Sequence, residues 1–177
     1  MTKEEFSKIA AAIRTFYPNQ NILPNIESVS LWYIQLCDID YETMTAAIYE
    51  WVATNKWAPT IADLRESARR ITLGDIPDWN SAYEHSRSII RKYGYYRYEE
   101  GMAQLSGVEL ETVKAIGYVD WCKSDNPSVI RAQYRDIYNA IATRRKHEEQ
   151  LPPGLKNALN MIREKEERRL IEDAGVQ

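Results

Sequence analysis

The sequence predicts an all-α protein, and three observations support this class. Apolar residues recur at spacings of three and four along most of the 177 residues, which is typical of amphipathic helices. Capping residues precede several of these stripes, and Pro or Gly follows them. No stretch alternates apolar and polar residues as a half-buried strand does. We therefore expect an N-terminal four-helix bundle, a second small helical unit and a C-terminal amphipathic helix.

The first two predicted helices belong to the N-terminal bundle. Thr2 and Glu5 have the spacing of a capping box, and Pro18 ends the pattern, which places a helix at about residues 3–17. Its apolar stripe consists of Phe6, Ile9, Ala10, Ile13 and Phe16. A second stripe follows a polar loop and consists of Ile26, Val29, Tyr33, Leu36 and Cys37, with Trp32 beside it.

Two further helices complete the predicted bundle. Asp40 can cap the third helix, which ends near Asn55. Its buried side comprises Tyr41, Met44, Ile48, Trp51 and Val52. Thr60 and Asp63 open the fourth helix, with the stripe Ile61, Leu64, Ala68 and Ile71. Amphipathic helices joined by short loops favour one domain, at residues 1–72.

A break at Gly74 and Pro77 indicates the start of a second unit, which we place at residues 77–150. Its first helix begins near Trp79 and ends near Gly94. Ser106 and Glu109 have capping-box spacing and predict a helix through Val113 and Ile116. Asn126 followed by Pro127 then opens a long helix that reaches about Glu149. One face of it carries Ile130, Tyr134, Ile137, Tyr138 and Ile141.

The last segment, residues 151–177, follows the Pro152-Pro153-Gly154 break and has few apolar residues. They form a narrow seam of Leu155, Leu159, Ile162 and Leu170 among alternating charges. Glu164 and Arg168 can pair at a spacing of four. Because the seam is too thin for a core, we predict that Leu159, Ile162 and Leu170 bind a partner protein.

The composition excludes several classes of function. The net charge of −3 argues against a membrane partner and against strong direct nucleic-acid binding, since both need a positive surface. Residues 1–18 contain no uninterrupted apolar run, so we expect no signal peptide and a cytoplasmic protein. Cys37 and Cys122 lack the spacing of a disulfide framework or a zinc site, and we expect both to be small buried residues.

Catalytic motifs are missing from the sequence. No glycine begins the GxxxxGK[ST] pattern that would cradle the phosphates of ATP. His85 and His147 stand in no catalytic motif, and we expect both to be solvated or hydrogen-bonded. The sequence therefore predicts that the protein is not an enzyme and needs no cofactor. An enzyme with an unrecognised cluster of ionisable residues is the alternative.

The segment from Arg91 to Tyr98 interleaves cations with tyrosines and has three open interpretations. Tyrosine suits a helix junction and a protein interface equally well, and it can also stack on bases while cations neutralise phosphates. The candidate partner-binding residues here are Tyr93, Tyr95, Tyr96 and Arg97. A rival function is a DNA-binding replication initiator that uses this cluster together with Arg91 and Lys92.

Two segments carry a resemblance to a known family. EEFSKIAAAIRTFYPN and WYIQLCDIDYETMTAAIYEWVATNKWAPTIADLRE resemble the N-terminal domain of bacteriophage proteins that load and inhibit a DnaB-type hexameric helicase. The blocks DWNSAYEHSRSIIRKYGYYRYEEGMAQL and VKAIGYVDWCKSDNPSVIRAQYRDIY look like the segment that follows such domains, so the resemblance spans about residues 1–145.

The resemblance implies a function in phage DNA replication. It implies an adaptor, without ATPase activity of its own, that binds the replicative helicase and inhibits it while bound. It also implies that the adaptor helps to load the helicase at the origin through an origin-binding replisome organiser. The family's helicase contact is assigned to the C-terminal portion, which here is long and strongly patterned.

Overall fold

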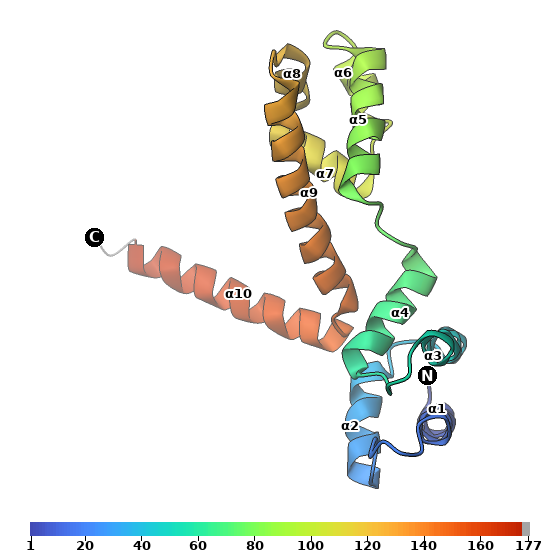
Figure 1. The fold of residues 1–177 in the computed structure, drawn as a ribbon. Helices are drawn as coiled ribbons and strands as arrows, with labels where there is room; N and C mark the ends of the chain where they lie inside the picture. Colours follow the sequence, from blue (N-terminus) through green and yellow to red (C-terminus); the bar gives the residue numbers. More distant parts are fainter. Residues whose placement is uncertain (175–177) are drawn as a thin grey trace. The chain divides into compact units, whose positions relative to one another are not determined.

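A computed structural model describes residues 1–174 of the chain, with side chains for residues 1–169. Ten helices and no strand occupy this described range, which confirms the predicted all-α class (Figure 1). The chain divides into two compact units. Unit 1 is Met1–Gly74 with Glu148–Gln177, and unit 2 is Asp75–His147. The predicted limits of 1–72, 77–150 and 151–177 differ from this division mainly because the C-terminal segment is grouped with the N-terminal helices.

Unit 1 begins with four helices whose starts are set by local hydrogen bonds. They are α1 (Lys3–Phe16), α2 (Ile26–Leu36), α3 (Tyr41–Thr54) and α4 (Ile61–Leu73). The predicted capping box is present at α1, where the Thr2 hydroxyl accepts from the backbone N–H of Glu5 at 3.2 Å. Asp40 caps α3 and Thr60 caps α4, also as predicted. These bonds satisfy backbone N–H groups that a helix start leaves unpaired.

The four helices enclose one mainly aliphatic core. Its fully buried side chains include Phe6, Ile13, Leu36, Met44 and Leu64. Figure 1 shows α1 and α3 nearly end-on while α2 and α4 are seen lengthwise, so the two pairs cross steeply. The remaining helix of this unit is α10 (Pro153–Ala174).

Unit 2 contains five helices of very different lengths. They are α5 (Trp79–Tyr93), α6 (Tyr98–Met102), α7 (Gly107–Ile116), α8 (Tyr118–Lys123) and α9 (Pro127–Gln150), the last of which continues into unit 1. Asp78 caps α5, and the Asn126 side chain accepts from the N–H of Val129 at 3.3 Å at the start of α9. In Figure 1 α5 and α9 run side by side, with α7 crossing behind them.

The core of unit 2 is built around stacked aromatic rings. Tyr83 stacks on Trp121 with ring centroids 5.5 Å apart, and Tyr134 stacks on Tyr138 at 5.6 Å. Tyr83 and Tyr134 meet edge to face at 5.4 Å, which joins the two pairs. The phenol of Tyr134 is fully buried and hydrogen-bonds the Ser86 hydroxyl at 3.0 Å. Burying these rings therefore leaves this phenol with a partner.

Two features of unit 2 differ from the sequence expectation. The predicted capping box at Ser106 is wrong, because its side chain makes no cap bond and the Glu109 carboxylate contacts His85 Nδ1 at 2.7 Å instead. The short helices α6 and α8 were not predicted. They pack together where Gly101 meets Tyr118, since a Cβ at Gly101 would lie 2.3 Å from the tyrosine hydroxyl. Such short elements depend on tertiary packing and leave little periodic signal.

Candidate functional site

Helix α2 is apolar on two faces, of which the core covers one. Leu36 is fully buried, and Val29 and Tyr33 pack against the core of unit 1. On the other face Ile26, Leu31 and Ile34 are 84%, 64% and 61% exposed. The prediction that Ile26 belongs to the core stripe is therefore wrong. An exposed apolar face of this kind is typical of a surface that binds another protein.

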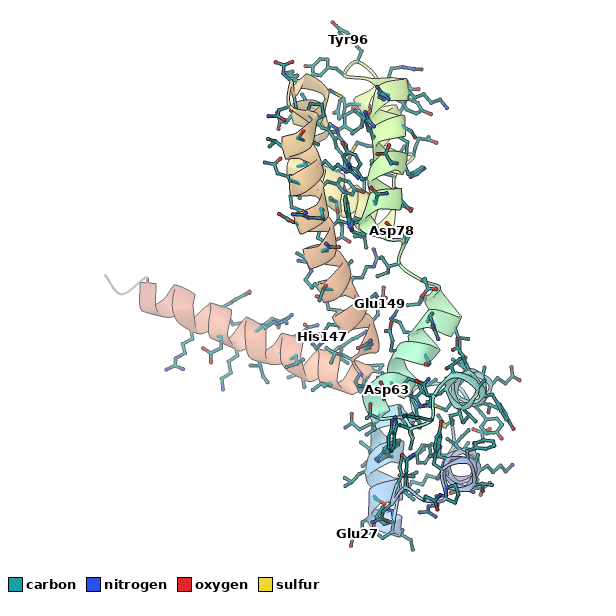
Figure 2. The ribbon with its side chains drawn as sticks, viewed as in Figure 1. Glu27, Asp63, Asp78, Tyr96, His147 and Glu149 are labelled. Atoms are coloured by element: carbon teal, nitrogen blue, oxygen red, sulfur yellow. The ribbon has the colours of Figure 1, made fainter. Side chains whose placement is uncertain are left out.

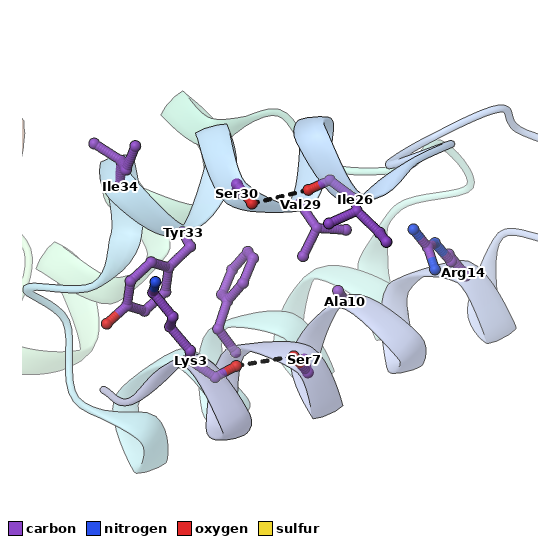
Figure 3. A pocket seen from close by; sticks show the side chains of 10 residues that line it. Lys3, Ser7, Ala10, Arg14, Ile26, Val29, Ser30, Tyr33 and Ile34 are labelled. Atoms are coloured by element: carbon purple, nitrogen blue, oxygen red, sulfur yellow. Dashed lines mark hydrogen bonds between the residues drawn. The ribbon is translucent and has the colours of Figure 1, made fainter.

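A groove with a volume of about 420 Å³ lies between α1 and α2 beside this face (Figure 3). Its lining residues are Lys3, Phe6, Ser7, Ala10, Arg14, Ile26, Val29, Ser30, Tyr33 and Ile34. We call it the α1–α2 groove. Two of its side chains, Ile26 and Ile34, also belong to the exposed face of α2.

The interior of the α1–α2 groove is apolar because its polar groups bond within their own helices. The Ser7 hydroxyl donates to the carbonyl of Lys3, and the Ser30 hydroxyl donates to that of Ile26, each at 2.9 Å. Phe6 packs against Tyr33 with ring centroids 5.8 Å apart. An apolar partner entering the groove therefore meets few polar groups that it must desolvate.

Basic side chains mark the two ends of the groove. Lys3 Nζ lies 6.0 Å from the ring centroid of Tyr33, and Figure 3 shows Arg14 at the opposite end. The Arg14 guanidinium donates to the carbonyl of Leu23. Leu23 has φ +53°, an uncommon conformation for a side chain of its kind, and is buried in the core. The bond from Arg14 therefore ties the loop before α2 to the end of α1.

Two buried arginines on α4 form a second polar centre in unit 1. Arg65 makes a bidentate ion pair with Asp38 at 2.8 and 2.9 Å and donates to the backbone carbonyls of Gln35 and Gln150. Arg69 contacts the carboxylates of Glu66 and Glu149 at 3.0 and 3.3 Å. These contacts fasten the last turn of α9 to α4 within unit 1.

The charges of this centre shift the pKa values of its groups. Burial alone would raise the pKa of Asp38, but the hydrogen bonds and positive charge of Arg65 outweigh burial and lower it below 3.8. Burial would likewise lower the pKa of Arg69, whereas hydrogen bonding and attraction from Glu66 and Glu149 raise it. Opposite charges thus compensate each other, and the centre is structural in character.

The predicted tyrosine cluster is divided by the structure. Tyr93 is half-buried against the core of unit 2, with the Arg97 guanidinium carbon 5.1 Å from its ring centroid. Arg97 also donates to the carbonyl of Lys92 at 2.9 Å. Tyr95 and Tyr96 are 46% and 95% exposed. Figure 2 shows Tyr96 projecting outward at the end of α5 opposite Asp78.

The predicted seam of α10 is open to solvent where its side chains are described. Ile162 is 59% exposed and Leu159 is half-buried. Arg168 and Glu164 pair at 3.8 Å, which confirms the predicted spacing of four. The side chain of Leu170 lies outside the described residues. The predicted contacts of Leu159, Ile162 and the tyrosine cluster with a partner stay predictions.

Few groups in the described range are arranged for chemistry. Residues 1–169 contain no cluster of three His, Cys, Asp or Glu side chains that could hold a metal ion. His85 is 55% exposed and pairs with Glu109, and His147 is exposed, as expected. Cys37 and Cys122 are only partly buried, so the prediction that both are buried is wrong. Within the described helices no segment has the length and apolar character of a membrane span.

The apolar face of α2 was missed from the sequence although a signal was present. The helix IESVSLWYIQL carries one charged residue, Glu27. A surface helix normally has a charged side, and a helix that is apolar all round is normally covered on both sides. Counting charges around α2 would therefore have indicated Leu31 and Ile34.

Comparison with known proteins gives one family match. Residues 1–65 match the family model for the N-terminal domain of the phage protein gp39P, a helicase loader and inhibitor. The match covers α1 to α3 and the start of α4, and therefore the whole α1–α2 groove. Residues 66–177 lie outside it. No curated protein and no solved structure matches the chain.

Proposed function

We propose that this chain is a phage DNA-replication adaptor. It binds a DnaB-type hexameric replicative helicase, inhibits the helicase while bound and helps to load it at the origin. The match of residues 1–65 to the N-terminal domain of the gp39P family is the observation that carries this proposal. It supports the helicase-loader resemblance of that part of the sequence.

In this proposal the adaptor catalyses nothing itself. The sequence has no phosphate-cradling GxxxxGK[ST] loop, so the helicase supplies the ATP hydrolysis. The adaptor acts in the cytoplasm of the bacterial host. An origin-binding replisome organiser is its second partner, since delivery to an origin requires a protein that recognises one.

Two apolar surfaces of unit 1 offer contacts to these partners. One comprises the α1–α2 groove with Leu31, and the other is the α10 seam of Leu155, Leu159 and Ile162. Each buried Leu or Ile contributes about 1.5–3 kcal/mol to an interface. Losing two of them should therefore weaken binding by about a hundredfold or more.

The proposal can be tested by measuring binding of the purified protein to a bacterial replicative helicase. Leu159→Asp with Ile162→Asp removes the α10 seam, and its matched control, Asn157→Asp with Asn160→Asp, places two carboxylates at exposed positions of the same helix. Ile34→Asp removes an apolar group from the α1–α2 groove, and Gln35→Asp is its exposed neighbour.

We expect the unmodified protein to bind the helicase and to suppress its ATPase and unwinding activities. At least one apolar-to-aspartate variant should lose binding by about a hundredfold while its control changes little. Absence of binding by the unmodified protein would contradict the proposal. ATP turnover that follows the protein through purification and variants would contradict its non-enzymatic part.

A further inference from the structure

A pocket of unit 2 combines an aromatic floor with an entirely positive rim. It has a volume of about 340 Å³ and lies beside the turn that follows α5. Buried side chains of Tyr83, Ile90 and Trp121 form its floor, and Arg87 and Arg91 line it from the same face of α5. Because Tyr83 stacks on Trp121 within the core, this floor is preformed.

The charged residues lining this pocket are arginines, with no carboxylate among them. Arg91 has no ion-pair partner among the described residues of the chain. Arg87 contacts Glu84 at 3.4 Å, but both side chains are more than a third exposed, so solvent weakens this pair. Two guanidinium groups are therefore free to bind an anion, and guanidinium suits phosphate in particular.

Two solvent-exposed aromatic rings continue the pocket outward. Tyr95 lines it and meets Tyr96 edge to face, with ring centroids 5.5 Å apart. Lys123 Nζ lies 5.0 Å from the ring centroid of Tyr95 and adds a third cation. Tyr96 is 95% exposed, and its ring face is available to a ligand (Figure 2).

We propose that this pocket, with Tyr95 and Tyr96, binds one or two nucleotides of a single-stranded nucleic acid. The phosphates lie at Arg87 and Arg91, and the bases stack on the tyrosine rings. Cations beside exposed aromatic rings are the combination that holds single strands without reading their sequence. A duplex keeps its bases stacked on one another, so it cannot present them to these rings.

This site is distinct from the predicted tyrosine cluster. Lys92 and Arg97 engage Tyr93 and the local backbone, whereas Arg87 and Arg91 line the pocket. Contact with about two phosphates also agrees with a protein of net charge −3, because so few contacts give weak binding that salt easily reverses. The inference is independent of the helicase proposal, since its test contains no helicase.

The test is a fluorescence anisotropy titration of the full chain with labelled oligothymidine, oligouridine and duplex DNA of equal length. Two phosphate contacts give a logarithmic salt slope of about −1.4, so single-strand affinity should fall about sevenfold between about 50 and 200 mM salt. Equal binding of the DNA and RNA strands indicates a site for any single strand. A preference for either strand identifies the type of nucleic acid bound.

Two pairs of variants locate the binding. Arg91→Ala should weaken binding about fivefold and reduce the salt slope by about 0.7, whereas Arg135→Ala, an exposed arginine of α9 outside the pocket, should change it less than about twofold. Tyr95→Ala should weaken binding at least about fivefold, and Tyr49→Ala, an exposed tyrosine of unit 1, should not. Circular dichroism melts show whether each variant is folded.

Several outcomes would overturn this inference. They are the absence of saturable binding at about 50 mM salt, tighter binding of the duplex, and equal losses for Arg91→Ala and Arg135→Ala. Competition by polyglutamate at the same concentration of negative charge as the oligonucleotide would identify an acidic protein segment as the occupant, and would equally reject a nucleotide site.

Discussion

The two units bury polar groups in different ways. Unit 1 surrounds an aliphatic core but buries two arginines of α4, which are balanced by carboxylates. Unit 2 buries neutral phenols within a stack of aromatic rings. Stability in unit 1 therefore depends partly on carboxylates being ionised, and stability in unit 2 depends on phenols being protonated. The difference teaches that one short chain can contain two units with opposite sensitivities to pH.

The largest effect that we expect comes from the aromatic core of unit 2. Tyr134→Ala should cost about 3–5 kcal/mol, because it leaves a cavity among three neighbouring rings and an unpaired Ser86 hydroxyl. Tyr134→Phe keeps the ring and should cost only about 1 kcal/mol. Residue-resolved hydrogen exchange should show lost protection in α5, α7 and α9 while α1 to α4 stay protected. Equal loss in both units would show that they do not unfold separately.

The corresponding change in unit 1 removes the carboxylate that balances Arg65. Asp38→Ala should cost about 2–3 kcal/mol, because a buried guanidinium then lacks its charged partner. Glu164→Ala, which breaks an exposed pair with Arg168 in α10, should change stability by less than about 0.5 kcal/mol. Urea unfolding at neutral pH measures both. A similar small cost for the two variants would place Asp38 among ordinary surface carboxylates.

The same carboxylate gives unit 1 its acid sensitivity. Since the folded pKa of Asp38 lies below its ordinary value of 3.8, its contribution is fully present above that value. The contribution is lost as the pH falls through the folded pKa. Asp38→Ala should accordingly flatten this acid limb of the stability profile.

Alkaline pH should act on unit 2 instead. Burial, followed by the negative charges of Glu109 and Asp78, raises the pKa of Tyr138 to about 12, and burial raises that of Tyr134 as well. Unfolded tyrosines ionise near pH 10, so this stability is present below pH 10 and is lost as the pH rises towards about 12. The loss is at most about 1.4 kcal/mol per pH unit for each phenol. Near-ultraviolet circular dichroism of the stacked rings should record it, and Tyr138→Phe should reduce it.

The smallest effect concerns the surface that unit 1 leaves open. Ile34→Asp should change the free energy of unfolding by less than about 0.5 kcal/mol, because Ile34 is largely exposed. Leu36→Ala, two positions along the same helix and fully buried, should cost about 2–5 kcal/mol. Thermal melts of both variants test the assignment of the two faces of α2. A large loss for Ile34→Asp would return this face to the core.

The helix starts were the most predictable part of the fold. Thr2, Asp40, Thr60 and Asn126 all accept bonds from backbone groups within three residues, so the sequence alone contains both partners of each bond. The same reasoning failed at Ser106, where Glu109 has a competing partner in His85, which is distant in sequence. Local rules therefore hold until a tertiary contact offers the side chain a better bond.

The candidate site was less predictable because its features depend on which helix faces meet. Ile26 fits a core stripe by spacing, yet the core accepts the face of α2 that carries Val29 and Leu36. Arg65 and Arg69 look like the charged side of α4 in the sequence, but residues about 80 positions away cover them.

The sequence by itself determined the all-α class and most of the helix limits, because caps and apolar periodicity act over three or four residues. Tertiary structure alone decided that α2 keeps an apolar face open, that α4 buries two arginines, and that Arg87 and Arg91 share a pocket with Tyr95. These outcomes depend on contacts between distant segments. Only the assembled helices define which side chains remain in water and which are removed from it.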